Sequence, residues 1–401
     1  MNRVINQPNV DSNSEAGLSD SEPGLLDGVL VLDMSQFLSG PFSALRLIDL
    51  GARVIKIERP DGGDLCRRLY LSDTELGGDS TLFHAINRGK ESFAADFKNP
   101  ADIAAVRKLI ARADIVIQNF RPGVIERLGF DYAKAREINP GIVYGSITGY
   151  GDDGPWKNLP GQDLLAQARS GVMWLNGDVD QGPVPFGLAI ADLLAGNAIV
   201  QGLLAGLVRR GVTGKGVHIQ TSLLEALVDF QFEVLATYLN DGGRAPTRSA
   251  FRNAHAYLSA PYGVYRTSDG WLALAMTPLD RLGPLLEAPE IMGLPADAAF
   301  RDRDEIKRII AGKFENKTTS AWLTILQPHD IWCAEVSDWP GLFASRNFEL
   351  LDMVQTLDRD DGVIVRTMRS PIRINGQRGR TQRAAPRIGE HTNALRKEFS
   401  L

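Results

Sequence analysis

The sequence has little from which a metal centre or a disulfide framework could be built. Cys66 and Cys333 are the only cysteines among 401 residues, and no CxxC or histidine spacing accompanies either. The five histidines show no HExxH spacing, and no serine stands in a GxSxG elbow. These absences predict no metal site and no metalloprotease or serine hydrolase. So few cysteines indicate a reducing, cytoplasmic setting.

A long basic run and a long uninterrupted apolar run are also missing. Lys and Arg number 44 against 49 Asp and Glu, for a net charge of −5, and both signs are scattered along the chain. This balance argues against nucleic acid or an anionic membrane as the main partner. No stretch approaches the ~20 uninterrupted apolar residues of a membrane span. Residues 1–24 are polar and acidic, and we predict a disordered tail there.

The rest of the chain alternates between strand and helix patterns and predicts an α/β fold. The predicted strands are GVLVLD, RVIKIER, DIVIQNF, IVYGSITGY and GVHIQTS, and helical segments separate them. Asn99 and Pro100 suit the start of one helix, and Ser222 with Glu225 forms a capping box at another. Strands separated in this way imply βαβ units and a mostly parallel sheet, in a large Rossmann-like domain.

A second, smaller α+β domain is predicted because the pattern changes after Asn240. The stretch YGVYRTSDGWLALAM indicates a hairpin that turns at residues 268–270, and amphipathic helices follow from about Arg303 to Gln327. Strands in VIVRTMRSPIRI are expected to return to the first domain. We therefore assign residues 25–225 and 345–401 to the large domain, and 226–344 to linkers and the small domain. A chain above roughly 250–300 residues commonly divides in this way.

Residues Gly149–Gly154 match the letters of the GxGxxG dinucleotide fingerprint and follow a predicted strand. In that fingerprint the glycines open an apolar helix. Here Pro155 and a polar loop come next. The context favours a flexible or substrate-covering loop over a nucleotide site.

Asp192 is the only ionisable residue between Val184 and Leu207, a segment rich in apolar and small side chains. One interpretation is an N-cap, because Asp is favoured where a helix begins and an apolar helix follows at once. The other is a nucleophile, since an accessible carboxylate can form covalent intermediates. The two interpretations are compatible.

Several blocks together resemble the class III CoA-transferases, the family that includes formyl-CoA:oxalate and carnitine CoA-transferases and is related to the α-methylacyl-CoA racemases. The resemblance extends from Leu25 to about Leu395. It rests on LDGVLVLDMSQFLSGPFSALRLIDLGARVIKIERPDGGD, NRGKESFAADFKNP, ADIVIQNFRPGVIERLGF, INPGIVYGSITGYGDDGP, AIADLLAG and PRIGEHT. No single block is specific, but the set is.

The resemblance implies an acyl-CoA:carboxylate CoA-transferase in which Asp192, within AIADLLAG, is the nucleophile. The carboxylate would attack an acyl-CoA thioester and pass through an aspartyl-CoA thioester, with no cofactor beyond coenzyme A as substrate. Positions that match the family's CoA contacts supply cations, apolar faces and backbone donors. They are Leu38, Ser39, Arg59, Ala95, Lys98, Asn119, Phe120, Arg121 and Arg127.

The chain departs from its relatives at two candidate acceptor sites. Asp163 matches an acidic residue near the family's active site, but Gln162 stands where the racemases have a histidine base. Glutamine cannot serve as a general base, so that racemase mechanism is not expected. The glycine-rich loop of the formyl-CoA transferases has no counterpart in FRNAHAYLSAPYG, which leaves formate and oxalate unassigned. Asn253 and His255 in this segment are candidates for contacting the acceptor.

Two other functions remain as alternatives: an acyl-CoA racemase or epimerase, and a non-catalytic CoA-binding paralogue. Deuterium exchange at the α-carbon of an acyl-CoA would identify the first, and CoA binding without exchange would identify the second. The family resemblance also implies an interlocked homodimer.

Overall fold

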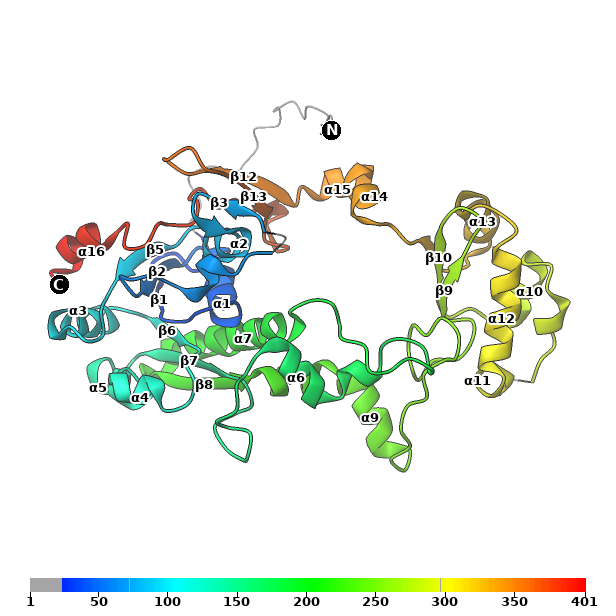
Figure 1. The fold of residues 1–401 in the computed structure, drawn as a ribbon, viewed down its shortest axis with the longest axis horizontal. Coiled ribbons are helices and arrows are strands. Elements are labelled where there is room, and N and C mark those ends of the chain that lie inside the picture. The colour runs from blue at the N-terminus through cyan, green and yellow to red at the C-terminus, as the bar shows by residue number, and fades with distance from the viewer. Residues whose placement is uncertain (1–23, 72, 296) are drawn as a thin grey trace. The chain divides into compact units, whose positions relative to one another are not determined.

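The computed structural model describes residues 24–71, 73–295 and 297–401 and divides into two compact units (Figure 1). Unit 1 comprises the described residues up to Phe37, Pro41–Ile117 and Asp352–Leu401. Unit 2 comprises Leu38–Gly40 and Gln118–Leu351. The tail predicted over residues 1–24 lies outside the described residues, apart from Gly24.

Six strands form the main sheet in the order β5-β2-β1-β6-β7-β8. Strands β5, β2, β1 and β6 pair in parallel, and so do β7 and β8, which confirms the predicted α/β fold with a mostly parallel sheet. The bounds are β1 Leu30–Asp33, β2 Arg53–Glu58, β5 Glu91–Ala94, β6 Ile115–Gln118, β7 Val143–Thr148 and β8 Val217–Ser222. Every residue of β1 is buried, as expected for a continuous apolar strand with both faces covered.

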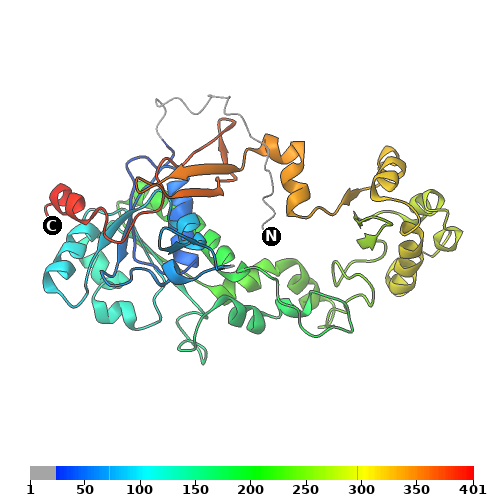
Figure 2. The same cartoon turned by 45° about the horizontal axis from the view of Figure 1, so that its top comes forward.

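Unit 1 places helices between its strands and adds a hairpin from the end of the chain. The helices are α1 Ser39–Ile48, of which Pro41–Ile48 falls in unit 1, α2 Thr81–Asn87, α3 Pro100–Ile110 and α16 Thr392–Phe399. Strands β12 Val354–Asp358 and β13 Ile364–Met368 pair antiparallel, and β13 packs against α2 (Figure 2). The C-terminal strands thus belong to unit 1, together with β1 and β2. The short strands are β3 Glu75–Leu76, β4 Asp79–Ser80, β14 Arg373–Ile374 and β15 Gln377–Arg378.

The caps of two helices follow the prediction. Asn99 caps α3 through a hydrogen bond from the Ala101 N–H, and Ser222 caps α8 (Leu223–Phe230) through one from the Glu225 N–H. Helix α1 begins at Ser39, and Pro41 is its third residue. Proline is tolerated there because the first-turn N–H groups have no intrahelical partner.

In unit 2 a long helix, α7, packs on β7 and β8. The helices of this part are α4 Val124–Leu128, α5 Tyr132–Ile138, α6 Asp163–Ser170, α7 Ile190–Thr213, α8 Leu223–Phe230 and α9 Phe232–Asn240. A Cβ atom at Gly206 would stand 2.8 Å from a methyl of Val143 and 2.9 Å from one of Val217. Glycine is therefore required for this close approach. By length and composition α7 could also cross a membrane, but it packs on the sheet and on α8 as a core helix does.

Residues 263–335 contain the predicted α+β elements around a separate core. Strands β9 Gly263–Arg266, β10 Trp271–Leu274 and β11 Cys333–Glu335 form an antiparallel sheet, and the β9–β10 hairpin turns at residues 268–270 as predicted. Tyr265, Phe314 and Trp322 pack together within the core. The helices here are α10 Leu279–Leu285, α11 Ala298–Arg301, α12 Arg303–Phe314 and α13 Thr319–Leu326, followed by α14 Trp339–Ala344 and α15 Arg346–Leu351.

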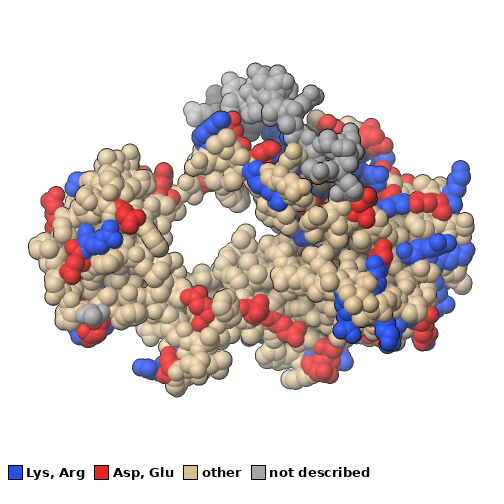
Figure 3. All heavy atoms as spheres, turned by 180° about the vertical axis from the view of Figure 1, so that it is seen from behind, with Lys and Arg blue, Asp and Glu red and all other residues tan. Residues whose placement is uncertain are grey.

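Charged side chains of both signs are interspersed on the face that Figure 3 shows. Blue and red groups alternate there, and tan surface separates them. This distribution matches the scattering of charge along the sequence.

Candidate active site

Asp192 lies in the first turn of α7 but does not cap the helix. The N-cap position is occupied by Ala189, which makes no side-chain hydrogen bond, and Asp192 is the third helical residue. The N-cap interpretation of Asp192 is therefore wrong. Its carboxylate is free for another role.

The cap comes instead from Asp163, the first residue of α6. Its Oδ1 accepts hydrogen bonds from the backbone N–H groups of Ala191 at 2.6 Å and Asp192 at 3.3 Å. A carboxylate is well suited to these free N–H groups, because the helix dipole also favours negative charge at this end. Asp163 thus satisfies the helix end from a separate segment of the chain.

A close backbone crossing places the segment that leads into α6. A Cβ atom at Gly149 would stand 2.5 Å from the Cα of Gly161, so both positions need glycine where these two backbone segments cross. Gly149 opens the GxGxxG-like stretch, and no helix follows it until Asp163. The first glycine of that stretch therefore has a packing role.

The Asp192 carboxylate is partly buried and is held by Ser39. Both the hydroxyl and the backbone N–H of Ser39, at the start of α1, hydrogen-bond to it. Burial, followed by the negative charge of Asp163, raises the pKa of Asp192 to about 6, and the bonds from Ser39 partly oppose this rise. The group is still mostly ionised at neutral pH. It is also more basic than an ordinary carboxylate, which is how a nucleophile or base is poised.

Six of the nine predicted CoA contacts belong to unit 2, and one of them, Ser39, is hydrogen-bonded to Asp192. Asn119 follows β6, and its Nδ2 donates to Ser39 Oγ at 3.4 Å. Leu38 precedes Ser39 in the loop between β1 and α1 and is half-buried. Phe120 and Arg121 line a small pocket after β6. Arg127, in α4, is exposed.

The remaining predicted CoA contacts belong to unit 1. Arg59 follows β2 and donates to the carbonyl of Gly63 at 3.3 Å. Ala95 follows β5 and is buried, and Lys98 is exposed close after it. These residues lie just beyond the carboxyl ends of two parallel strands, the edge where open α/β sheets bind ligands.

The predicted acceptor contacts have other partners. The Asn253 side chain accepts from the Ser249 N–H at 3.0 Å and donates to the Leu175 carbonyl at 3.2 Å. His255 Nε2 lies 3.7 Å from Glu233. Gln162 is exposed at the N-cap of α6 and makes no capping bond. Among the described residues, Asn253, His255 and Gln162 form no hydrogen bond or ion pair with Asp192.

A buried ion cluster at the strand ends of unit 1 was not predicted. Lys90 donates to Asp33 at 2.7 Å and to the Pro41 carbonyl at 2.9 Å, and Lys56 donates to the Ser35 carbonyl at 2.9 Å. These bonds hold the backbone on both sides of the Leu38–Gly40 segment. Burial would raise the pKa of Asp33, but the charges of Lys56 and Lys90 outweigh it and lower the pKa to about 2.

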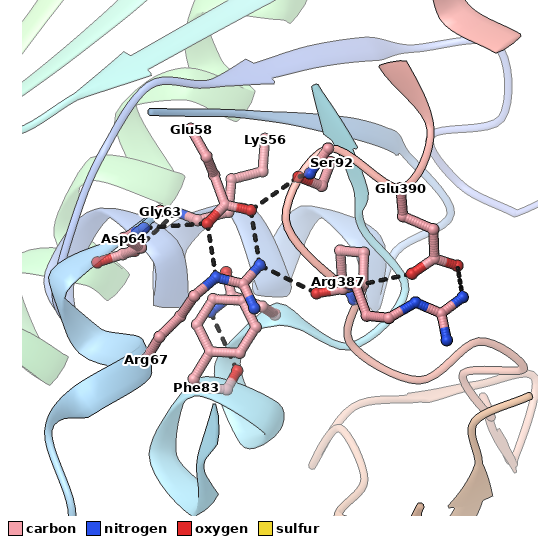
Figure 4. Close-up of polar contacts among 12 residues, drawn as sticks. Lys56, Glu58, Gly63, Asp64, Arg67, Phe83, Ser92, Arg387 and Glu390 are labelled. Carbon is pink, nitrogen blue, oxygen red and sulfur yellow. Dashed lines mark hydrogen bonds and ion pairs between the residues drawn. The ribbon is translucent and has the colours of Figure 1, made fainter. Parts of the chain in front are cut away.

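The same cluster continues through Arg67. Its guanidinium donates to both carboxylate oxygens of Glu58, at 2.9 and 2.8 Å (Figure 4). It also donates to Asp79 at 3.0 Å. It also lies over the ring of Phe83. Ser92 donates to the same Glu58 carboxylate at 2.8 Å. Lys56 in RVIKIER is a charge within a buried strand pattern, and that could have indicated the cluster from sequence.

Comparison with known proteins places this chain in a family. A model of CoA-transferase family III matches residues 26–392. The chain is 33% identical over 384 residues to a succinate–glutarate CoA-transferase of Agrobacterium fabrum, covering 91% of this chain and 93% of the relative. It is 32% identical over 386 residues to an acetyl-CoA:oxalate CoA-transferase of Acetobacter aceti, covering 94% and 96%.

A solved structure supports the same assignment. A CAIB/BAIF family protein from Brucella suis superposes with a TM-score of 0.82 at 31% identity, covering 94% of this chain and all of that one. Together with the family match along nearly the whole sequence, these likenesses confirm the resemblance seen in the sequence blocks. The chain belongs to CoA-transferase family III.

Proposed function

We propose that this enzyme moves coenzyme A from an acyl-CoA to a carboxylic acid, with Asp192 as the nucleophile. The observation that carries the proposal is the Asp192 carboxylate, which is partly buried, held by Ser39 and relieved of capping by Asp163. A carboxylate so placed can form covalent intermediates. Family membership supports the reaction type.

The reaction divides into two matched halves. The Asp192 carboxylate attacks the thioester carbonyl, CoA leaves as thiolate, and an acyl-aspartyl anhydride forms. The thiolate then attacks the aspartyl carbonyl, which releases the donor acid and leaves an aspartyl-CoA thioester. The acceptor carboxylate attacks this thioester and expels CoA thiolate. The thiolate attacks the acyl carbonyl of the new anhydride, releasing the new acyl-CoA and free Asp192.

The surroundings of Asp192 favour these covalent states. Burial and the negative charge of Asp163 disfavour the ionised form of Asp192, in agreement with the raised pKa of Asp192. In both the anhydride and the thioester the Asp192 side chain is uncharged, so esterification relieves this repulsion. The Ser39 N–H and hydroxyl remain available to the acyl oxygen, where they would stabilise the charge that develops on it.

We propose short dicarboxylates as the acids. Relatives of this chain are named for succinate and glutarate, for oxalate and for mesaconate. We propose Leu38, Ser39, Asn119–Arg121 and Arg127 as the CoA contacts within unit 2. The candidate CoA contacts within unit 1 are Arg59, Ala95 and Lys98. We also propose that the enzyme is a cytoplasmic homodimer. Large apolar side chains exposed on α9, α14 and α15 support a second copy as partner: Phe232, Leu239, Trp339, Phe343 and Leu350.

The covalent intermediate can be trapped. The enzyme is incubated with succinyl-CoA and then treated with hydroxylamine, which converts an aspartyl thioester to a hydroxamate. Peptide mass spectrometry is expected to find the modification on Asp192 only when the acyl-CoA is present. The peptide that contains Asp163 is the internal control, because that carboxylate accepts the helix N–H groups and is expected to stay unmodified.

Modification of another carboxylate while exchange proceeds would contradict the role of Asp192. A panel of acceptors, with succinyl-CoA as donor and glutarate, oxalate and mesaconate as acids, tests the dicarboxylate proposal. Incorporation of deuterium at the α-carbon without acceptor would favour the racemase instead.

The two neighbours of Asp192 are expected to shift its pKa in opposite directions. Asp163→Asn removes a negative charge and so lowers the pKa of Asp192 below about 6, whereas Ser39→Ala removes a stabilising hydrogen bond and raises it. Only the ionised carboxylate attacks. The rising limb of kcat/KM against pH should therefore move to lower pH in Asp163→Asn and to higher pH in Ser39→Ala.

The measurement is the exchange rate as a function of pH for both variants and the wild type. Asparagine keeps a side-chain oxygen for the Ala191 N–H, so Asp163→Asn retains part of the cap. A rising limb that stays in place in both variants would show that a different group governs it.

A further inference from the structure

Gln167 is a buried amide whose polar atoms are all used within one small region. Its side chain lies four residues after Asp163 on the same face of α6, and only 2% of the residue is exposed. Nε2 donates to Asp163 Oδ2 at 2.6 Å and to the Leu188 carbonyl at 3.1 Å. Oε1 accepts from the Phe186 N–H at 2.9 Å.

These bonds connect Gln167 to Asp192 by two routes. The first runs through Asp163, since one carboxylate oxygen faces Gln167 and the other accepts from Ala191 and Asp192. The second runs through the chain that enters α7, because Phe186 and Leu188 directly precede the helix start at Ile190. Both routes end at the first turn of α7.

We propose that Gln167 is a positioning residue for the nucleophile: it fixes the Asp163 carboxylate and the 186–188 segment together, and thereby sets where the Asp192 carboxylate points. The amide is suited to this because it can donate to a carboxylate and a carbonyl while accepting from an N–H. This inference rests on the proposed function of Asp192. The hydrogen bonds of the Gln167 side chain among the described residues go to Asp163, Leu188 and Phe186, so its effect on Asp192 is indirect.

Two substitutions test the proposal. Gln167→Leu keeps much of the volume and removes all three hydrogen bonds, so kcat is expected to fall by about 10- to 100-fold with KM for the acyl-CoA little changed. Gln167→Glu places a second carboxyl group against Asp163. Two carboxyl groups so close share a proton, so this variant can donate to Asp163 only while protonated.

Gln167→Glu therefore has a signature that simple destabilisation would not produce. In the pH range where kcat/KM rises, Gln167→Glu is expected to be more active than Gln167→Leu. At higher pH its activity is expected to fall, because the proton shared with Asp163 is lost. The wild type has no such fall from this pair. Folding is followed at each pH by circular dichroism, so that loss of structure and loss of activity are separated.

Gln231→Leu is the matched control. Gln231 is also a buried amide of unit 2, and it donates to the carbonyls of Ser170 and Leu227 without contacting Asp163. Its replacement should lower the melting temperature while leaving kcat and its pH profile unchanged. A similar fall of kcat in Gln231→Leu would reduce the role of Gln167 to general stability.

The outcomes also separate this proposal from the proposed function. Normal kcat in Gln167→Leu, or a profile of Gln167→Glu without a falling limb, would overturn the positioning role even if Asp192→Ala is inactive. Full exchange by Asp192→Ala would instead overturn the nucleophile, whatever the Gln167 variants do. If Gln167→Leu does not fold, the pH profile of Gln167→Glu decides alone.

Discussion

Replacing Asp192 by asparagine is expected to reduce CoA exchange by about a thousandfold or more, because loss of a covalent nucleophile leaves only binding and orientation to assist the reaction. Asparagine has nearly the same shape, and its Oδ1 can still accept from Ser39. The lost property is therefore the nucleophilic carboxylate. Steady-state transfer from succinyl-CoA measures the loss, and the hydroxylamine adduct should disappear with it.

The same variant carries its own folding control. Because the pKa of Asp192 rises from 3.8 to about 6 in the folded protein, the native state binds the proton more tightly than the unfolded chain does. The resulting stability is present at low pH and is lost as pH rises through about 6. Above that pH, the free energy of unfolding of Asp192→Asn should be at least equal to that of the wild type, and up to ~3 kcal/mol higher. An inactive variant that is also less stable would leave the loss of exchange attributable to misfolding.

Replacing Arg67 by alanine is expected to have the largest effect on stability. Arg67 is 3% exposed and donates to Glu58, Asp79 and a backbone carbonyl, so its removal leaves two carboxylates without their main partner. Breaking a buried pair in this way costs about 3–5 kcal/mol. That is a large part of the ~5–15 kcal/mol that stabilises a typical protein. Urea unfolding followed by circular dichroism measures the loss.

Arg53→Ala is the matched control for Arg67→Ala. Arg53 also pairs with two carboxylates, Glu91 and Glu398, but its side chain is 40% exposed. Exposed pairs contribute only about 0–1 kcal/mol because water screens them. Equal destabilisation by the two substitutions would show that burial does not decide the strength of these pairs.

Much of the fold could be predicted because its signals are local. The buried strands carry continuous β-branched and aliphatic runs, and Asn99 and Ser222 stand where their helices begin. The hairpin at residues 268–270 was also evident from its turn residues. Helix α6 was missed because DLLAQARS is short and gives only two turns of pattern. The α14 and α15 pair was missed for the same reason.

The site was predicted in part. Asp192 was singled out because a lone carboxylate in an apolar segment is conspicuous, and its predicted capping role was wrong. The true cap, Asp163, lies 29 residues earlier than Asp192 along the chain. No local pattern reports a contact over that separation. Gln167 carries no signal at all, since a glutamine in a short helix is usually a surface residue.

The buried ion cluster could have been predicted only in small part. Asp33, Lys56 and Lys90 come from three separate segments. Asp33 looks like an ordinary charged residue at the end of an apolar run, and Lys90 looks like one in a polar stretch. These charges can be buried only because they pair in space, which offsets the cost of removing them from water. Lys56 was the one detectable member, because it is flanked by isoleucines within a strand pattern.

The glycine contact between α7 and the sheet matters for anyone who wishes to change the acid that this enzyme accepts. A side chain at position 206 would meet Val143 and Val217 and push the helix outward, so its far end would move as well. A mutant library meant to alter specificity should keep this residue fixed, even though it lies about four turns from Asp192. A substitution at position 206 would shift the whole helix α7, and an activity screen would record that shift as a change of substrate preference.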